Sequence, residues 1–173
     1  MVYIENHEIA LIRYSHKDDK DMFECWSDID TQKGFNYVMN ESFEEFRQFN
    51  IDEYRFWATI ILKETECPIG TIRLSCDMEN PDLAIWIYRP YRNRGYGTKA
   101  FSLALEYCFT EFNLKEIVAG CYEDNSNSKK MLTTLGFVRD KGKDSVEKNG
   151  FTRKETVQLA YRIYRDMCTA HRK

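Results

Sequence analysis

The chain has 173 residues, of which 43% are hydrophobic, and this is enough for a single domain with one sizeable core. Its 25 basic and 28 acidic residues give a formal charge of −3, which excludes the strongly basic balance typical of nucleic-acid binding and favours a small-molecule or peptide partner. Six cysteines without a C-x-x-C pair, no signal-like leader and no long apolar run predict a cytoplasmic protein with no metal site and no membrane contact.

The first half of the chain is predicted to hold strands and two capped helices. Aromatic and β-branched runs predict strands at residues 9–14, 54–62, 69–76 and 83–88. Between the first two strands, Ser15 begins a predicted helix over 15–28, and the capping-box pattern at Ser42 begins another over 42–49.

The second half alternates helix and strand. An apolar stripe predicts a helix over 97–112, a strand follows at 117–122, and a short helix over 126–135 ends before Gly136. From residue 137 the chain is again strand-like, and an Asn149-Gly150 turn predicts a hairpin into a strand at 156–163. The predicted class is α+β, with a strongly twisted, mixed central sheet of about seven strands and helices on both faces.

The segment at residues 85–98 carries the clearest chemical signal. A strand runs into a basic turn with glycines at 95 and 97, and a helix follows. Glycines let the backbone approach a ligand, and a helix N-terminus offers unpaired N–H groups and a positive dipole end, so the segment indicates a phosphate site. The alternative is a tight turn with two solvated arginines.

A dinucleotide-binding enzyme is a rival interpretation, because residues 95–100 also match G-x-G-x-x-A. In that fingerprint the strand runs almost directly into the first glycine. Here six residues, including Pro90, separate Tyr88 from Gly95, and too little chain follows for a second nucleotide-binding half. A nicotinamide-dependent oxidoreductase is therefore the weaker hypothesis.

Two motifs together resemble the GNAT superfamily of acetyltransferases. Arg92-x-x-Gly95-x-Gly97 resembles its pyrophosphate loop. Asn125-x-x-Ser128 followed by Gly136-Phe137 resembles its second signature. Ile12-Arg13 with Asp18-Asp19 after it, and the Asn149-Gly150 hairpin, resemble in particular the branch of ribosomal-protein N-terminal acetyltransferases. The resemblance covers nearly the whole chain, 1–173. The resemblance implies one GNAT domain, with acetyl-CoA as cosubstrate and no metal.

The resemblance also implies which residues bind the cosubstrate. The pantetheine arm would pair with the backbone of the strand before the turn, and the pyrophosphate would lie on N–H groups at the start of the helix. The implied residues are Ile85, Trp86, Ile87, Arg92, Asn93, Arg94, Gly95, Tyr96, Gly97, Thr98, Asn125 and Ser128.

For catalysis the resemblance implies Ser128 as the acid for the departing thiolate and Glu147 as the base. Leu132 stands where many members have a tyrosine acid, and Gly120 stands where some have a glutamate base. Other carboxylates remain alternatives for the base, namely Asp82, Glu123 and Asp124, whereas Cys121 is interpreted as a packing residue.

The acceptor and the oligomeric state stay open at this stage. Candidates are a protein N-terminal amine, a polyamine, an aminoglycoside or another small amine, and the negative net charge slightly favours a cation. Four aromatic residues are candidates for the acceptor pocket, namely Trp26, Phe35, Tyr37 and Phe43. A monomer or homodimer is expected, and the alternative function is a non-catalytic domain that binds acetyl-CoA.

Overall fold

The computed structural model describes residues 1–170, and the side chains of residues 1–167. In this range the strands are β1 (Val2–Glu5), β2 (Ile9–Arg13), β3 (Trp57–Leu62), β4 (Cys67–Leu74), β5 (Leu83–Ile87), β6 (Glu116–Tyr122), β7 (Val138–Arg139), β8 (Ser145–Lys148) and β9 (Glu155–Tyr164). The α-helices are α1 (Asp19–Ser27), α2 (Ile29–Phe35), α3 (Phe43–Phe46), α4 (Tyr96–Glu111), α5 (Ser126–Thr134) and α6 (Arg165–Ala170). None of the helices within this range is long and apolar enough to cross a bilayer.

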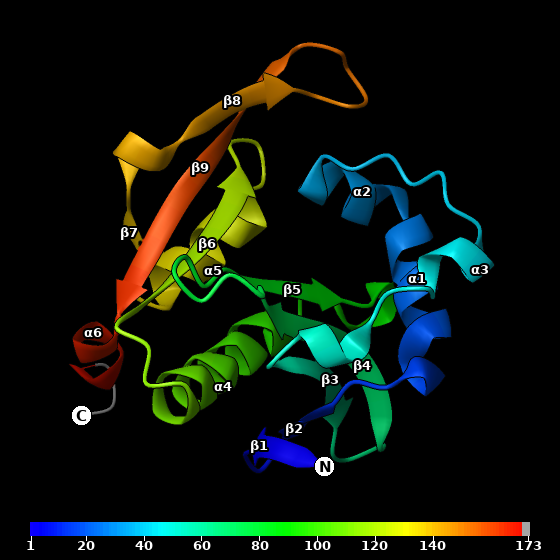
Figure 1. Cartoon of the computed structure of the whole chain (residues 1–173), viewed down its shortest axis with the longest axis vertical. Helices are drawn as coiled ribbons and strands as arrows, with labels where there is room; N and C mark the ends of the chain where they lie inside the picture. The colour runs from blue at the N-terminus through cyan, green and yellow to red at the C-terminus, as the bar shows by residue number, and fades with distance from the viewer. Residues whose placement is uncertain (171–173) are drawn as a thin grey trace.

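The first sheet is antiparallel, in the order β1-β2-β3-β4-β5, and it is covered on both faces (Figure 1). Strand β3 is buried along almost its whole length, as expected for a central strand. On one face the apolar stripe of α4 packs on the sheet and forms the larger core with residues such as Phe56, Ile72 and Phe101. On the other face, Met22 and Cys25 of α1 join Trp86 in a smaller, mostly aromatic cluster.

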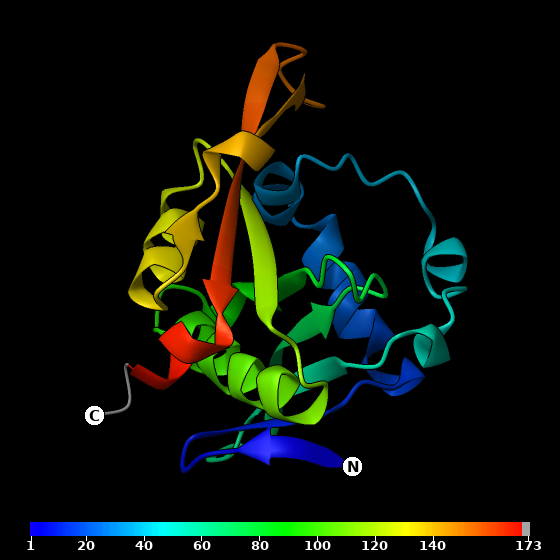
Figure 2. The same cartoon turned by 60° about the vertical axis from the view of Figure 1, so that its left-hand side comes forward.

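The second sheet contains β6, β9 and β7 in that order, with β8 also paired to β9. The two sheets meet at one parallel bridge, between Asp82 and Val118, next to the hydrogen bond from the Val118 N–H to the Pro81 carbonyl. Beyond this bridge β5 and β6 diverge, and α4 and α5 follow these two strands (Figures 1 and 2). In place of the predicted single sheet of about seven strands, residues 1–170 form nine strands in two sheets, because β5 and β6 lose their pairing after the bridge.

The local sequence signals are mostly confirmed. Ser15 and Asp18 form a capping box before α1, and Ser42 and Glu45 form one before α3. Buried Asp18 also accepts a hydrogen bond from Thr59 on β3 at 3.0 Å, which fixes the start of α1 on the sheet. Helix α5 ends before Gly136, which has a φ of 86°, as predicted.

The structure differs from the sequence predictions at four places. Strand β1 and helix α2 were not predicted, and the helix from Ser42 ends already at Phe46. The hairpin between β8 and β9 is present, but its loop spans residues 149–154 and Gly150 does not have a positive φ. In place of a two-residue turn, the Asn149 side chain accepts hydrogen bonds from the N–H groups of Phe151 and Thr152.

Candidate active site

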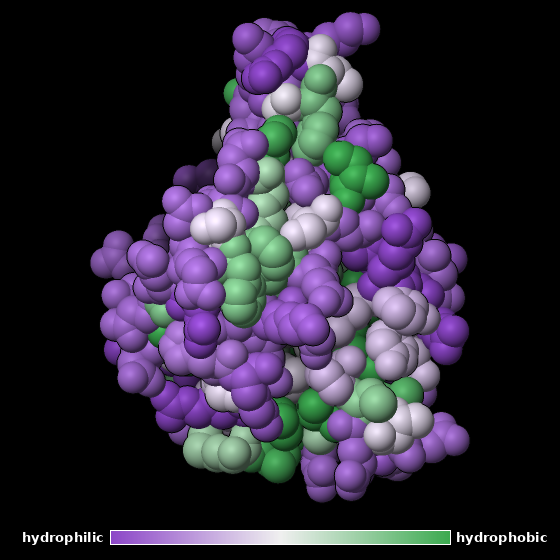
Figure 3. Space-filling view, turned by 90° about the vertical axis from the view of Figure 1, so that its right-hand side faces the viewer, coloured by the Kyte–Doolittle hydropathy of each residue, from purple (hydrophilic) through white to green (hydrophobic). Residues whose placement is uncertain are grey.

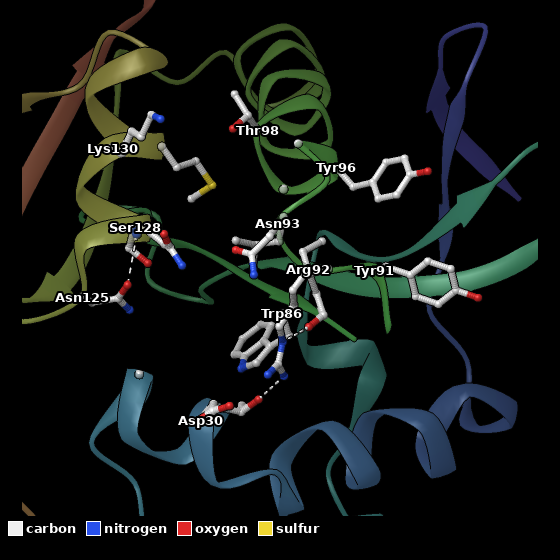
Figure 4. Close-up of a pocket in the computed structure, with 18 of the residues that line it drawn as sticks. Asp30, Trp86, Tyr91, Arg92, Asn93, Tyr96, Thr98, Asn125, Ser128 and Lys130 are labelled. Carbon is white, nitrogen blue, oxygen red and sulfur yellow. Dashed lines mark hydrogen bonds between the residues drawn. The ribbon is translucent and has the colours of Figure 1, made fainter. Parts of the chain in front are cut away.

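A cavity of about 620 Å³ opens where β5 and β6 diverge (Figure 4). Its walls come from β5, the turn after β5, the N-termini of α4 and α5, and helix α2. The lining residues are Asp30, Thr31, Gly34, Phe35, Ile85, Trp86, Ile87, Tyr91, Arg92, Asn93, Gly95, Tyr96, Gly97, Thr98, Asn125, Asn127, Ser128, Lys130 and Met131. Two helix N-termini therefore point at one cavity, which suits an anionic ligand.

The turn into α4 supplies the backbone donors of this cavity. Asn93 and Gly95 have positive φ values of 61° and 81°, and this conformation turns the chain sharply into the helix. Within the described chain, no backbone hydrogen bond is donated by the N–H groups from Asn93 to Thr98. A Cβ atom on Gly97 would lie 3.6 Å from both Ile87 and Met131, so the absence of a side chain there leaves room between β5 and α5. These groups fit the pyrophosphate of a nucleotide cosubstrate.

The Arg92 side chain is engaged by protein groups. Its Nε donates to the Ile87 carbonyl at 2.9 Å, and its two terminal nitrogens lie 2.6 Å from Asp28 and 2.7 Å from the Thr31 hydroxyl. Burial alone would raise the pKa of Asp28, but the hydrogen bond and charge of Arg92 lower it below its ordinary value. Asp28 also accepts a hydrogen bond from the Thr31 N–H at the start of α2. Arg92 thus fastens α2 to the end of β5.

The start of α5 contributes Asn125 and Ser128. The Asn125 side chain accepts a hydrogen bond from the Ser128 N–H at 3.1 Å, which is the predicted N-cap (Figure 4). Among the described residues, none hydrogen-bonds the Ser128 hydroxyl, and Ser128 lines the cavity together with Lys130. Leu132 is only 2% exposed and belongs to the core, so its position offers no proton donor to the cavity.

Glu147 lies on β8, outside the lining of the cavity. Its carboxylate accepts hydrogen bonds from the Tyr122 hydroxyl and from the Asn36 amide, the latter at 3.1 Å. Burial and the bond to Glu147 raise the pKa of Tyr122 to about 12, so its hydroxyl stays a donor near neutral pH. Asn36 in turn accepts from the Gly150 N–H at 2.8 Å. The end of α2 and the β8–β9 hairpin are therefore tied together beside the cavity.

A smaller aromatic cavity shares the Trp86 wall with this one. Of the aromatic residues considered for an acceptor pocket, Trp26 and Tyr37 line the smaller cavity and Phe35 lines the larger one. Phe43 lines neither and packs edge-on against Phe23 instead.

The sequence therefore located most of the larger cavity. Among the implied cosubstrate residues, only Arg94 lies outside its lining, where its side chain is exposed. Among the alternative bases, Asp82 lines a separate cavity and Glu123 accepts a hydrogen bond from the Val157 N–H. Cys121 is buried and packs in the core, as expected. In the described residues no group of three or more potential ligands could hold a metal ion.

Most of the contribution of α2 was missed, since Phe35 alone had been named as a candidate pocket residue. Asp30, Thr31, Gly34 and Phe35 all come from this helix, for which no strand or helix was predicted. A local signal was present, because Asp28 is an N-cap residue and Asn36 ends the helix with a φ of 51°. The position of α2 beside the cavity could not be predicted from the local sequence, because it depends on the hydrogen bonds from Arg92 to Asp28 and Thr31.

Comparisons with known proteins agree with this geometry. Residues 9–138 match the family model described as an acetyltransferase (GNAT) domain. The chain is 27% identical to the uncharacterized N-acetyltransferase YnaD of Bacillus subtilis, over 80% of this chain and 84% of that protein. It is 25% identical to the uncharacterized N-acetyltransferase p20 of Bacillus licheniformis, over 77% of this chain and 81% of that protein.

Solved structures share the fold at lower identity. A spermidine N-acetyltransferase from Vibrio cholerae, solved in complex with CoA and spermine, superposes with a TM-score of 0.84 at 17% identity, covering 95% of this chain and 99% of that one. A ribosomal-protein-S5-alanine acetyltransferase from Vibrio fischeri superposes with a TM-score of 0.73 at 16% identity, covering 96% and 98%.

Proposed function

The chain belongs to the GNAT acetyltransferase family, and from this premise we propose that it transfers the acetyl group of acetyl-CoA to a primary amine, on a protein N-terminus or a small molecule. The observation that carries the proposal is the cavity between β5 and β6, into which the free N–H groups at the start of α4 point. We propose that residues 1–173 act as one enzyme unit.

The residues lining the cavity fit the parts of acetyl-CoA, which supplies the acetyl group as a thioester. The N–H groups from Asn93 to Thr98 would bind the pyrophosphate, and Lys130 adds a positive charge nearby. The backbone of β5 at Ile85 to Ile87 would pair with the pantetheine arm, because β6 no longer pairs with this edge of β5.

In the proposed reaction the neutral amine nitrogen forms a bond to the acetyl carbon, the carbon–sulfur bond breaks, and the proton lost by nitrogen is balanced by one gained by the thiolate. Ser128 is the proposed donor to the thiolate, since its hydroxyl lines the cavity while its N–H is occupied by Asn125. Glu147 is the proposed base. Because Tyr122 and Asn36 hold its carboxylate outside the cavity lining, it would take the proton through the Tyr122 hydroxyl or a water.

Two measurements test this proposal together. Acetyl-CoA at a hundredfold excess over its dissociation constant should stabilise the protein by about 2.7 kcal/mol, and NAD should not. A thiol-release assay over a panel of amines should then show CoA release that depends on the acceptor. Stabilisation by acetyl-CoA without release for any amine would instead identify a non-catalytic binding protein, and stabilisation by NAD alone would contradict both.

We also propose that the enzyme works in the cytoplasm, as a monomer or homodimer. The cysteines Cys25, Cys67, Cys76, Cys108 and Cys121 are free thiols in the structure, which suits a reducing compartment. Light scattering on the purified protein would give its oligomeric state.

A further inference from the structure

The smaller cavity, beside the larger one, has a volume of about 160 Å³. This is well below the roughly 300–1,000 Å³ typical of drug-sized ligand sites, so it suits a compact molecule or one end of a larger one. Its lining residues are Met22, Trp26, Tyr37, Phe46, Phe49, Trp57, Arg73 and Trp86. In Figure 3, mainly hydrophilic residues cover the face on this side of the molecule, and hydrophobic residues show in small groups.

Arg73 is the one charged residue in this lining. It lies on β4 opposite Trp57 of β3 and Ala84 of β5. Its guanidinium carbon is 4.6, 4.9 and 5.4 Å from the ring centres of Tyr54, Trp57 and Trp86 respectively. Three aromatic rings therefore hold the guanidinium in place, and each adds a cation–π attraction.

No ion pair or hydrogen bond occupies the Arg73 guanidinium in the described part of the chain. Asp82 interacts with it electrostatically, but from beyond ion-pair distance. Each arginine carries five N–H donors in a fixed fork that matches a carboxylate. Arg73 is thus a positioned, half-buried cation whose hydrogen-bonding capacity is unused by described side chains.

The lining of the cavity also contains donors and no carboxylate. The indole N–H groups of Trp57 and Trp86 are buried and find no acceptor among the described residues. No aspartate or glutamate lines the cavity. A ligand that brings a negatively charged acceptor group would balance this excess of donors, whereas a polyamine would place its cationic groups beside Arg73.

The cavity is adjacent to the position proposed for acetyl transfer. Trp86 lies on β5 among the residues proposed to pair with the pantetheine arm, and it lines both cavities. In the sheet, Trp86 is opposite Thr71, which is two residues from Arg73 on β4. The side chains of Trp86 and Arg73 are therefore on the same face of the sheet. A small ligand held at Arg73 could therefore present a nearby amine toward β5.

From this geometry we propose that the acceptor is an amine that also carries a carboxylate, such as an apolar amino acid, and that Arg73 binds the carboxylate. The aromatic walls surround the apolar side chain of the acceptor. This inference rests on the proposed acetyl transfer, and it replaces the expectation of a cationic acceptor that the net charge of the chain suggested.

The test uses matched ligands on the full chain. Calorimetry with the CoA-saturated protein compares N-acetylphenylalanine with N-acetyl-2-phenylethylamine, and thiol release compares phenylalanine with 2-phenylethylamine and spermidine. The wild-type protein should favour the carboxylate ligand by about ten- to a hundredfold, in affinity and in kcat/KM, as expected for a charge-assisted hydrogen-bonded pair. Arg73→Met should abolish the preference and leave CoA affinity unchanged.

Two further variants keep the result interpretable. Arg73→Lys retains the charge but not the planar fork, so it should keep the fold and lose several-fold of the preference. Arg55→Met removes an exposed guanidinium outside this cavity and should behave like the wild-type protein.

Each outcome separates the two proposals. Equal affinity for both ligands, a preference for spermidine, or a carboxylate preference that survives in Arg73→Met would overturn the role of Arg73. Carboxylate-selective binding without thiol release for any amine would overturn acetyl transfer and leave Arg73 as a carboxylate site. Thiol release with no carboxylate preference would support acetyl transfer and overturn the role of Arg73.

Discussion

Replacing Arg92 by methionine separates two roles for this residue, a phosphate ligand or a clamp for α2. The substitution removes three hydrogen bonds, to Ile87, Asp28 and Thr31, and leaves the Asp28 carboxylate, whose side chain is 9% exposed, without its nearest cation. Hydrogen bonds to charged groups contribute about 1.5–3 kcal/mol each, but they are not additive at one site. Arg89 remains 3.5 Å from Asp28 and compensates in part. We therefore expect Arg92→Met to lower the free energy of unfolding by about 2–3 kcal/mol.

The assay is urea and thermal unfolding of the protein without acetyl-CoA, where this loss corresponds to about 4–12 °C in Tm for a chain of this size. The matched control is Arg94→Met, because Arg94 is exposed and outside the cavity, and it should change stability by less than about 0.5 kcal/mol. Acetyl-CoA affinity should fall only a few fold, through the displaced α2. An Arg92→Met protein as stable as wild type, but unable to bind acetyl-CoA, would refute the clamp and assign the Arg92 charge to the phosphates.

The pH dependence of the same pair gives a second check. The pKa of Asp28 is lower in the folded protein than its ordinary value, so its contribution to stability is present above the unfolded pKa of about 3.9. That contribution is lost as the pH falls through the lower folded pKa. The stability difference between wild type and Arg92→Met should therefore be constant from about pH 5 to 7 and shrink in stronger acid.

Substitutions at four other positions test the cavity and the sheet. Gly97→Val should weaken acetyl-CoA binding in calorimetry more than Arg92→Met does. Gly97→Ala should bind nearly normally, because a Cβ there meets its neighbours at an ordinary 3.6 Å. Normal binding by Gly97→Val would contradict the proposal that the backbone N–H groups from Asn93 to Thr98 bind the pyrophosphate. Ser128→Ala keeps the N–H bond to its capping residue and should lower kcat by about a hundredfold at nearly unchanged acetyl-CoA affinity, and an unchanged kcat would remove the serine from the mechanism. Glu147→Gln should lower kcat/KM by roughly a hundredfold at neutral pH, with partial recovery as rising pH deprotonates the amine. A wild-type kcat/KM across that pH range would show that Glu147 only holds α2 and the β8–β9 hairpin together. Gly70→Ala should destabilise the protein in urea by about 1–3 kcal/mol, because its Cβ would lie 2.3 Å from the Trp86 carbonyl, and wild-type stability would show that β5 moves freely.

Local patterns were enough to predict the elements that frame the larger cavity, except for α2. The strand before the turn, the glycines at 95 and 97, and the asparagine cap of α5 act over a few residues, so their sequence spacing carries their geometry. The N-cap at Ser15 and the capping box at Ser42 were readable for the same reason. With the family resemblance, these segments located the part of the cavity where we propose that acetyl-CoA binds.

Only the tertiary structure showed which contacts close the cavity and which side chains surround Arg73, the residue that we propose selects the acceptor. Arg92 meets Asp28 across 64 residues, and Asn36 meets Glu147 across 111, so no local pattern could show that these side chains satisfy each other. Likewise, the spacing of Tyr54, Trp57, Arg73 and Trp86 gives no sign that three rings surround one guanidinium. Charge and aromatic character are read from the sequence, but whether a group is used up by a partner or left for a ligand is determined by how the strands pair and the helices pack.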